Sequence, residues 1–390
     1  MKHRAWREDF PFFKLTPYCY LDSAATSLKP QCVIDTVSTF YQEETANLAR
    51  GEHLLTYRVT ERIEQTREGV AQLIGAHPHE IIFTFSATDS LNMIAKSIMT
   101  NQQPCIVSTM NHHAALLPFM QSGPVRYVKD DQGQIDLDNF RKLCQQSPLL
   151  MVVPWVCNAN GNQLPIKQMC DIAKEYGVMT VVDAAQSVGH MPVDVDDLGC
   201  DFLAFSAHKA LGPSAVGVLY ARVSCIEKLQ PMRLGGGIVS SVTQEAYQLR
   251  VPPYRFEAGT PNLEGIIGFG AGLDYLHRQG IGQIVKHLNQ LEAYATQQFS
   301  TLDCVKPTFA YTPEHAPIFN LTVTHPSINT AQLSMLLAER FNIITNYSQH
   351  CCQPLYLTHH ATDAMRVSFY LYNEKEDIDL LVNAINEILG

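Results

Sequence analysis

The sequence predicts an α/β fold built around a mostly parallel sheet. Short runs rich in β-branched residues alternate with helical stretches through the first two thirds of the chain. Because parallel strands need crossover connections, this alternation predicts a sheet that helices cover on both faces. The chain has 390 residues, 46% of them hydrophobic, which is enough to bury one large core or two unequal ones. We therefore expect a large domain and a smaller one.

The elements of the large domain can be placed in order. Pro30 stands at the first turn of a helix whose apolar residues recur with a helical period. The apolar face of this helix is predicted to comprise Val33, Ile34, Val37 and Phe40. Strands are predicted at 81–85, 105–108, 149–153, 178–182 and 202–205, and a helix at 166–176.

The last third of the chain changes pattern. From about Ile266 a long helix is followed by strands at 318–323 and 365–370 and then by a final helix. Asn373 and Glu376 are spaced as a capping box for that helix. We assign this last third, together with the N-terminal arm, to the smaller domain.

Charge and composition exclude several classes of partner. The net charge is -10 and no basic block occurs, so nucleic acid and anionic membranes are poor partners. The N-terminus lacks a signal-peptide pattern, and the longest apolar stretch, at 149–157, is interrupted by Pro154 and too short to span a bilayer. Eleven cysteines without framework spacing indicate reduced thiols. We expect a cytoplasmic protein with no membrane segment.

Two charged residues at neighbouring strand ends predict a pyridoxal phosphate site. Asp183 ends one buried strand, and Lys209 lies just past the next. Ligands in parallel sheets bind outside the carboxyl ends of the strands. The lysine amine can bond the cofactor aldehyde, while the carboxylate pairs with the ring nitrogen. A surface lysine and a turn-capping aspartate are the plain alternatives, but Ser206 and His208 beside Lys209 favour the cofactor.

A phosphate site is predicted at the start of a helix. Residues 86–90 form a Ser/Thr/Asp-rich cluster between a strand and an apolar helix, and Thr88 is the candidate donor within it. Helix N-termini bind phosphate through their free N–H groups and their dipole. A simple helix cap is the alternative explanation. Ser206 and His208 are expected to complete the phosphate cradle.

With these residues in place, the chain resembles the fold-type I, class V aminotransferase-like pyridoxal phosphate enzymes. Within them it is similar to the SufS/CsdA-type cysteine desulfurases. The matching blocks are 20–26, 50–53, 111–114, 255–262 (RFEAGTPN) and 349–351 ahead of Arg366. The resemblance implies a large cofactor-binding domain over 17–262 with a seven-stranded sheet. It also implies a small domain over 1–16 and 263–390 that carries a catalytic cysteine loop.

The resemblance assigns further site residues. It implies that His112 stacks on the pyridine ring and helps to move protons, and that Asn158 and Gln186 contact the ring hydroxyl. A structural loop histidine and a plain turn at Asn158 are the alternatives. Thr260 is expected to reach the phosphate from a second subunit, so a homodimer is implied. His53 and Asn158 are assigned to the substrate.

Cys351 separates this group from its relatives. It lies in a polar loop at 346–353, where a solvent-reachable thiol could approach a substrate held on the cofactor. The adjacent Cys352 should point elsewhere. No metal site is expected, because the spacing of the local His and Cys residues does not suit one: His350, Cys351, Cys352, His359 and His360.

Arg366 is the predicted ligand of the substrate α-carboxylate. A guanidinium binds a carboxylate through two parallel hydrogen bonds, which suits an amino-acid substrate. A surface ion pair is the alternative.

The activity that the resemblance implies is desulfuration of L-cysteine to L-alanine. Lys209 would remove the α-proton and the Cys351 thiolate would attack the substrate sulfur. The resulting persulfide would pass to an acceptor protein of the SufE/CsdE type or to a reductant.

Departures from the family pattern keep alternatives open. Asn346 and Ser348 stand where arginine and glycine are usual. These substitutions keep open a weakly active, cofactor-binding sulfur-transfer paralogue. A selenocysteine lyase shares the fold and the cofactor, and Cys351 alone does not exclude it. Cys351 speaks against a class V aminotransferase, and Gly235 to Gly237 does not form the fingerprint of a dehydrogenase.

Overall fold

A seven-stranded sheet forms the centre of the larger lobe in the computed structural model, which describes residues 6–48, 53–99, 102–131 and 133–390. All neighbouring strands run parallel except at β10, which is antiparallel to both of its neighbours. This confirms the predicted mostly parallel, seven-stranded sheet. The strand order is β2 (Ile81–Thr84), β10 (Gly217–Ala221), β9 (Phe202–Ser206), β8 (Met179–Asp183), β7 (Leu150–Pro154), β3 (Cys105–Val107) and β4 (Val125–Tyr127).

The five strands placed from the sequence occur within one residue of their predicted starts. Strands β4 and β10 were not placed from the sequence. β4 has only three residues at the sheet edge, too few to display a period of two. β10 is buried throughout, and an uninterrupted apolar run does not distinguish a strand from a buried helix.

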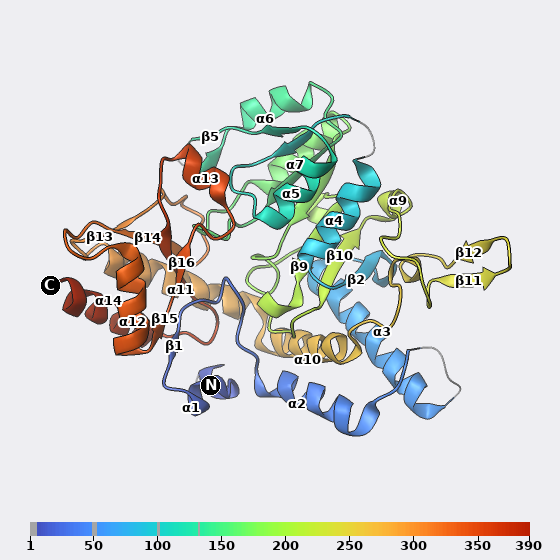
Figure 1. Ribbon diagram of the computed structural model, residues 1–390, viewed down its shortest axis with the longest axis horizontal. Helices are drawn as coiled ribbons and strands as arrows, with labels where there is room; N and C mark the ends of the chain where they lie inside the picture. Colours follow the sequence, from blue (N-terminus) through green and yellow to red (C-terminus); the bar gives the residue numbers. More distant parts are fainter. Residues whose placement is uncertain (1–5, 49–52, 100–101, 132) are drawn as a thin grey trace.

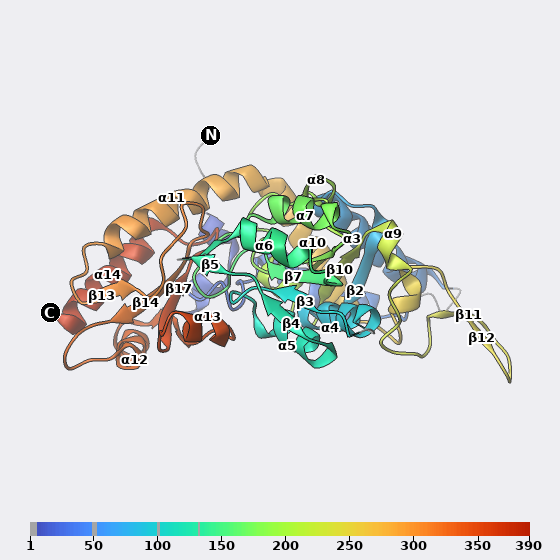
Figure 2. The ribbon, with the colours of Figure 1, turned by 90° about the horizontal axis from the view of Figure 1, so that it is seen from above.

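Helices cover both faces of this sheet, as the sequence predicted (Figures 1 and 2). Successive strand residues enter opposite cores: Ile81 and Phe83 pack on one face, and Ile82 on the other. The first face is covered by α3 (Leu54–Ile74), α6 (Leu137–Cys144), α7 (Ile166–Glu175) and α10 (Leu263–Gln279). The second is covered by α4 (Ala87–Ile98), α5 (His113–Ser122) and α9 (Val223–Ile226).

The smaller lobe contains a four-stranded antiparallel sheet. Its strands are, in order, β13 (Val305–Pro307), β14 (Ile318–Val323), β17 (Ala364–Ser368) and β16 (Asn346–Ser348). Its core also takes in α11 (Ile281–Phe299), α12 (Thr330–Phe341) and α14 (Lys375–Leu389). Helix α13 (Gln353–Thr358) follows the loop that carries Cys351.

The predicted capping box of α14 was wrong by one residue. The box is formed by Glu374 and Asp377. Asn373 cannot cap the helix because it is buried and its amide is used elsewhere, on the Tyr370 N–H and the Tyr20 carbonyl.

Two elements pack with the lobe to which the predicted boundaries do not assign them. Strand β1 (Cys19–Tyr20) pairs with β15 (Ile343–Ile344), while α10 contributes Phe269 to the core of the large lobe. The boundaries at 16/17 and 262/263 therefore remain predictions. Helix α2 (Gln31–Thr39) begins after Pro30 as predicted and buries Val33, but Ile34 is 40% exposed, contrary to expectation.

The remaining elements are short. They are η1 (Trp6–Asp9), α1 (Phe12–Leu15), η2 (Phe40–Glu44), η3 (Pro78–Glu80), β5 (Asp130–Asp131), β6 (Gln134–Ile135), α8 (Val195–Leu198), η4 (Ala207–Lys209), β11 (Val239–Val242), β12 (Tyr247–Leu249) and η5 (Tyr254–Phe256). No helix in the described ranges combines the length and the apolar character needed to cross a membrane. All eleven cysteines are free thiols.

A buried ion pair ties the edge strand β2 to the segment after η5. The Arg67 side chain is 2% exposed and donates to Glu257 Oε1 at 2.8 Å and to the Ile81 carbonyl. The same carboxylate oxygen accepts the Phe83 N–H at 2.7 Å. One carboxylate therefore joins helix α3, strand β2 and the segment that leads to Thr260.

We predict that Glu257→Gln destabilises the fold by about 3 kcal/mol, because it leaves the buried Arg67 guanidinium with only the partly exposed Glu64, 3.0 Å from Nε, as a counter-charge. The measurement is the midpoint of urea unfolding. Glu227→Gln is the matched control, because Glu227 pairs with Arg255 at 2.8 Å but its side chain is 65% exposed. The Glu227→Gln substitution should lower the free energy of unfolding by less than about 1 kcal/mol. Equal effects of both substitutions would contradict the prediction.

Candidate active site

A cavity of about 370 Å³ opens where the carboxyl ends of β7, β8 and β9 meet the smaller lobe. This volume is within the usual range for a small-molecule site. The predicted site residues that line the cavity are Thr88, His112, Asn158, Asp183, Gln186, Ser206, His208, Lys209, Cys351 and Arg366. A larger cavity, of about 900 Å³, lies beside Trp155 and Asp194 and contains none of them.

Two predicted residues lie outside the cavity of the single chain. His53 is exposed and caps helix α3, where its ring accepts the Thr56 N–H. Thr260 is exposed on the segment after η5. Arg50, Gly51 and Glu52 of the matching block lie outside the described residues.

Lys209 and Asp183 are placed by adjacent parallel strands. Strand β8 ends at Asp183, and β9 leads directly into η4, which ends at Lys209. Burial lowers the pKa of Lys209 to about 8, although Asp183 acts in the opposite direction. Burial also raises the pKa of Asp183, against its hydrogen bond from the Ala185 N–H and the charge of Lys209. With a pKa of about 8, roughly a tenth of the Lys209 amine is neutral at pH 7, and this fraction can act as a nucleophile or base.

The start of helix α4 supplies donors for an anion. Ser86 caps the helix, and Ser206 Oγ accepts the Ala87 N–H at 2.8 Å. Among the described residues, the Thr88 N–H and hydroxyl have no hydrogen-bond partner, and Thr88 lines the cavity. His208 lines the same cavity, and its Nδ1 lies 3.2 Å from Thr26 Oγ1. A helix N-terminus with a free N–H and hydroxyl groups is suited to phosphate.

His112 is held as a neutral ring with a defined tautomer. It caps helix α5, and its Nδ1 accepts the Ala114 N–H at 3.0 Å. Burial, followed by the charge of Lys209, lowers the pKa of His112 to about 4. The proton of the neutral ring is therefore on Nε2, and this nitrogen is free to donate to a group in the cavity.

Two amide side chains line the cavity, and each already donates one hydrogen bond to a backbone carbonyl. Asn158 Nδ2 donates to the His350 carbonyl at 2.7 Å. Gln186 Nε2 donates to the Ala24 carbonyl at 2.8 Å. Each amide nitrogen carries a second N–H, so either residue could still donate to a ring oxygen.

Cys351 lies on the loop between β16 and α13 and is exposed at the cavity edge. His350 and Cys351 have φ angles of 50° and 54°, and the Cys351 carbonyl accepts the His113 N–H at 2.9 Å. Cys352 is buried, and its thiol faces the Thr109 carbonyl at 3.6 Å. The two adjacent thiols therefore point into different surroundings.

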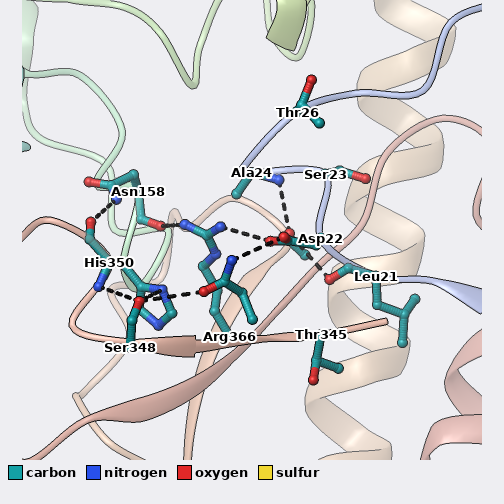
Figure 3. A network of polar contacts seen from close by, with 12 residues as sticks. Leu21, Asp22, Ser23, Ala24, Thr26, Asn158, Thr345, Ser348, His350 and Arg366 are labelled. Carbon is teal, nitrogen blue, oxygen red and sulfur yellow. Dashed lines mark hydrogen bonds and ion pairs between the residues drawn. The ribbon is translucent and has the colours of Figure 1, made fainter. Parts of the chain in front are cut away.

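Arg366, on β17, is buried and joined to two other segments (Figure 3). Its Nη2 donates to Asp22 Oδ1 at 2.8 Å and its Nη1 to the Asn158 carbonyl at 3.0 Å. The Nε atom is buried and has no partner among the described residues. Asp22 Oδ2 accepts the Asn346 amide at 3.1 Å.

Asp22 was missed by the sequence reasoning. It lies inside the matching block 20–26, but nothing local links it to an arginine 344 residues away. Its side chain is only 14% exposed, so the contact is not the surface ion pair considered as the alternative for Arg366. A carboxylate immediately after a buried strand was the available signal.

The arrangement fits pyridoxal phosphate. A buried amine, a buried carboxylate at the neighbouring strand end, a helix start with free donors and a neutral histidine face one cavity. Among the described residues, no cluster of His, Cys, Asp and Glu side chains could hold a metal ion.

Comparison with known proteins agrees with this geometry. The aminotransferase class-V family model matches residues 19–381. A probable cysteine desulfurase of Halalkalibacterium halodurans is 34% identical, covering 95% of this chain and 93% of the relative, and the cysteine desulfurase of Haloferax volcanii is 33% identical, covering 95% and 89%.

Solved structures give the same assignment. The apo cysteine desulfurase of Thermococcus onnurineus superposes with a TM-score of 0.93 at 33% identity, covering 98% of this chain and 97% of the other. The cysteine desulfurase CsdA (S-sulfonic acid) of Escherichia coli superposes with a TM-score of 0.90 at 31% identity, covering 99% and 98%. With a matching family model over almost its whole length and full-length relatives above 30% identity, this chain belongs to the aminotransferase class-V family.

Proposed function

We propose that this protein is a pyridoxal phosphate-dependent cysteine desulfurase that converts L-cysteine to L-alanine. The observation that carries the proposal is one cavity that contains the Lys209 amine, the Cys351 thiol and the Arg366 guanidinium. An aminotransferase needs no thiol at this place, whereas sulfur transfer does. The family assignment and the names of the relatives support the same reaction.

When bound, the cofactor supplies an electron sink for the charge left by loss of the α-proton. Asp183 would hold the ring nitrogen in its protonated form, and this contact would offset the cost of burying the carboxylate. Lys209, with a pKa of about 8, would accept the α-proton once the substrate amine has replaced it. Arg366 would bind the α-carboxylate and fix the orientation of the substrate.

Cys351 would act as the sulfur acceptor. Its thiolate attacks the substrate sulfur, so that an S–S bond forms as the C–S bond breaks. The C–S electron pair stays with the carbon fragment, which takes up protons and leaves as L-alanine. The sulfur remains as a persulfide on Cys351, from which an acceptor protein of the SufE/CsdE type or a thiol reductant removes it.

We also propose a homodimer. Thr260 and His53 are exposed in the single chain and lie outside its cavity. A second subunit that presents Thr260 would add a hydroxyl to the phosphate cradle at the start of α4. This would account for the position of Thr260 on a segment anchored by the buried Arg67–Glu257 pair.

The first functional prediction concerns covalent attachment of the cofactor. The rate at which the cofactor-free protein binds pyridoxal phosphate covalently should rise as the pH rises through about 8, because only the neutral Lys209 amine attacks an aldehyde. The readout is absorbance, followed by borohydride fixation and peptide mapping. Lys209→Ala should abolish fixation.

Lys29→Ala is the matched control for this experiment. Burial lowers the pKa of Lys29 to about 7, but Lys29 does not line the cavity. The control should therefore retain fixation. Cofactor fixed on Lys29, or a rate that is flat across pH 8, would contradict the assignment of Lys209.

The second functional prediction concerns Cys351→Ser. A serine hydroxyl is hardly ionised near neutrality and cannot hold a persulfide, so alanine formation from cysteine should fall by about a thousandfold or more. Exchange of the α-proton with deuterated solvent depends on Lys209 and should persist. Both rates are measured side by side in wild type and variant.

Cys304→Ser is the control, since Cys304 is half-buried and lies outside the cavity. It should leave both rates unchanged. Wild-type alanine formation by Cys351→Ser would remove Cys351 from the proposed mechanism. Loss of cysteine turnover with retained selenocysteine breakdown would identify the thiol as the feature that permits cysteine as a substrate.

A further inference from the structure

Polar contacts between Arg366 and the Cys351 loop form a closed ring (Figure 3). The Arg366 Nη2 donates to one Asp22 oxygen, and the Asn346 amide donates to the other. The Asn346 amide oxygen in turn accepts a hydrogen bond from the Ser348 hydroxyl. The ring continues to His350 and returns through Asn158, which donates to the His350 carbonyl and accepts from Arg366. The carboxylate-binding arginine is thereby connected to the residue before Cys351.

The ring holds a strained segment. Ser348 Oγ lies 3.0 Å from His350 Nδ1 and accepts the His350 N–H at 2.9 Å. His350 and Cys351 both have left-handed backbone conformations, with φ angles of 50° and 54°. Neither residue is glycine, so the conformation is maintained by surrounding contacts rather than by local preference. Loss of those contacts would allow the Cys351 loop to relax.

Charge at the arginine is balanced before any substrate binds. Asp22 lies 2.8 Å from Arg366, and both side chains are largely buried. Burial lowers the pKa of His350 to about 3 and that of His112 to about 4, so both rings are neutral near pH 7. Asn346, at the other Asp22 oxygen, is uncharged. A substrate carboxylate at Arg366 would therefore place two negative charges against one guanidinium.

Arg366 lines the cavity, and its buried Nε has no partner among the described residues, so the guanidinium keeps one unused donor. A carboxylate bound to this guanidinium would share it with Asp22, whose Oδ1 lies 2.8 Å from Nη2. Two carboxylates at one guanidinium repel each other, and burial reduces the screening of that repulsion by water. Asp22 is the partner that can give way, because its other contact is a single neutral hydrogen bond from Asn346.

We propose that Asp22 is a positioning residue that occupies Arg366 until an amino-acid carboxylate replaces it, and that Asn346 transmits this exchange to the Cys351 loop. The inference rests on the proposed roles of Arg366 and Cys351. When the carboxylate binds, the Asp22–Asn346 contact loosens first. The contacts of Ser348 and His350 then loosen, and the Cys351 thiol becomes free to move. By thermodynamic linkage, the factor by which the bound carboxylate favours the released loop equals the factor by which release of the loop raises the affinity for the carboxylate.

The test measures Cys351 alkylation by iodoacetamide in the holoenzyme, located by peptide mass spectrometry. Two ligands are compared at saturation, judged from the cofactor absorbance: L-alanine and L-alaninamide. They have almost the same shape and shield the thiol equally, but only L-alanine brings a carboxylate charge. In wild type, alkylation should be faster with L-alanine by a factor of about five or more.

Two variants separate the parts of the coupling. Asp22→Asn should bring the alkylation ratio of the two ligands to about one and should tighten L-alanine binding severalfold while leaving L-alaninamide binding unchanged. Asn346→Ala should also bring the ratio to about one, although it keeps the Asp22–Arg366 pair. A merely structural role for Asp22 would not tighten binding selectively. Asp363→Asn is the control, because Asp363 lies next to β17 outside the ring, and it should keep the wild-type ratio.

Equal alkylation rates with the two ligands in wild type would overturn the proposal, since the carboxylate would then have no effect on the loop. An unchanged ratio in both Asp22→Asn and Asn346→Ala would overturn it as well, and so would failure of L-alanine to bind at all. The assay does not depend on turnover. A protein that shows the coupling but forms no alanine from cysteine would refute the desulfurase proposal alone.

Discussion

The site depends on two opposite charges buried at the ends of neighbouring parallel strands. β8 and β9 run parallel, so Asp183 and the segment leading to Lys209 emerge at the same edge of the sheet. Burial disfavours both charged forms, lowering the pKa of Lys209 to about 8 and raising that of Asp183. Such a pair is costly to bury without further partners. A cationic ring nitrogen near Asp183 and an aldehyde near Lys209 would remove both costs, and for this reason the pair suits the cofactor.

The groups that we propose to handle the substrate come from the other lobe. Antiparallel pairing of β16 and β17 sets Asn346 opposite Arg366, and the next few residues lead to Cys351. Asp22 arrives from the N-terminal segment, where β1 has just paired with β15 of the small lobe. Sheet register therefore determines which groups meet at the guanidinium. A shift of one residue would turn these side chains to the opposite face.

Neighbouring residues of the same type differ because of their surroundings. Cys351 is exposed at the cavity edge while Cys352 is buried against the Thr109 carbonyl. A hydrogen bond with the Cys157 thiol, together with burial, keeps the pKa of the Cys352 thiol well above its usual value. A thiol in that state is a poor nucleophile. Position on the loop, rather than residue type, decides which cysteine is exposed at the cavity.

The sequence by itself determined the alternating α/β pattern, the strands that end at Asp183 and Ser206, and the candidate lysine, because these features depend on local periodicity and on residues close in the chain. It misplaced the cap of α14 because the burial of Asn373 is a tertiary property. Only the tertiary structure joined Asp22 to Arg366, separated by 344 residues, and closed the ring through Asn346 to the Cys351 loop. Contacts between segments so far apart leave no local pattern, since they are fixed by sheet register and by the packing of one lobe on the other.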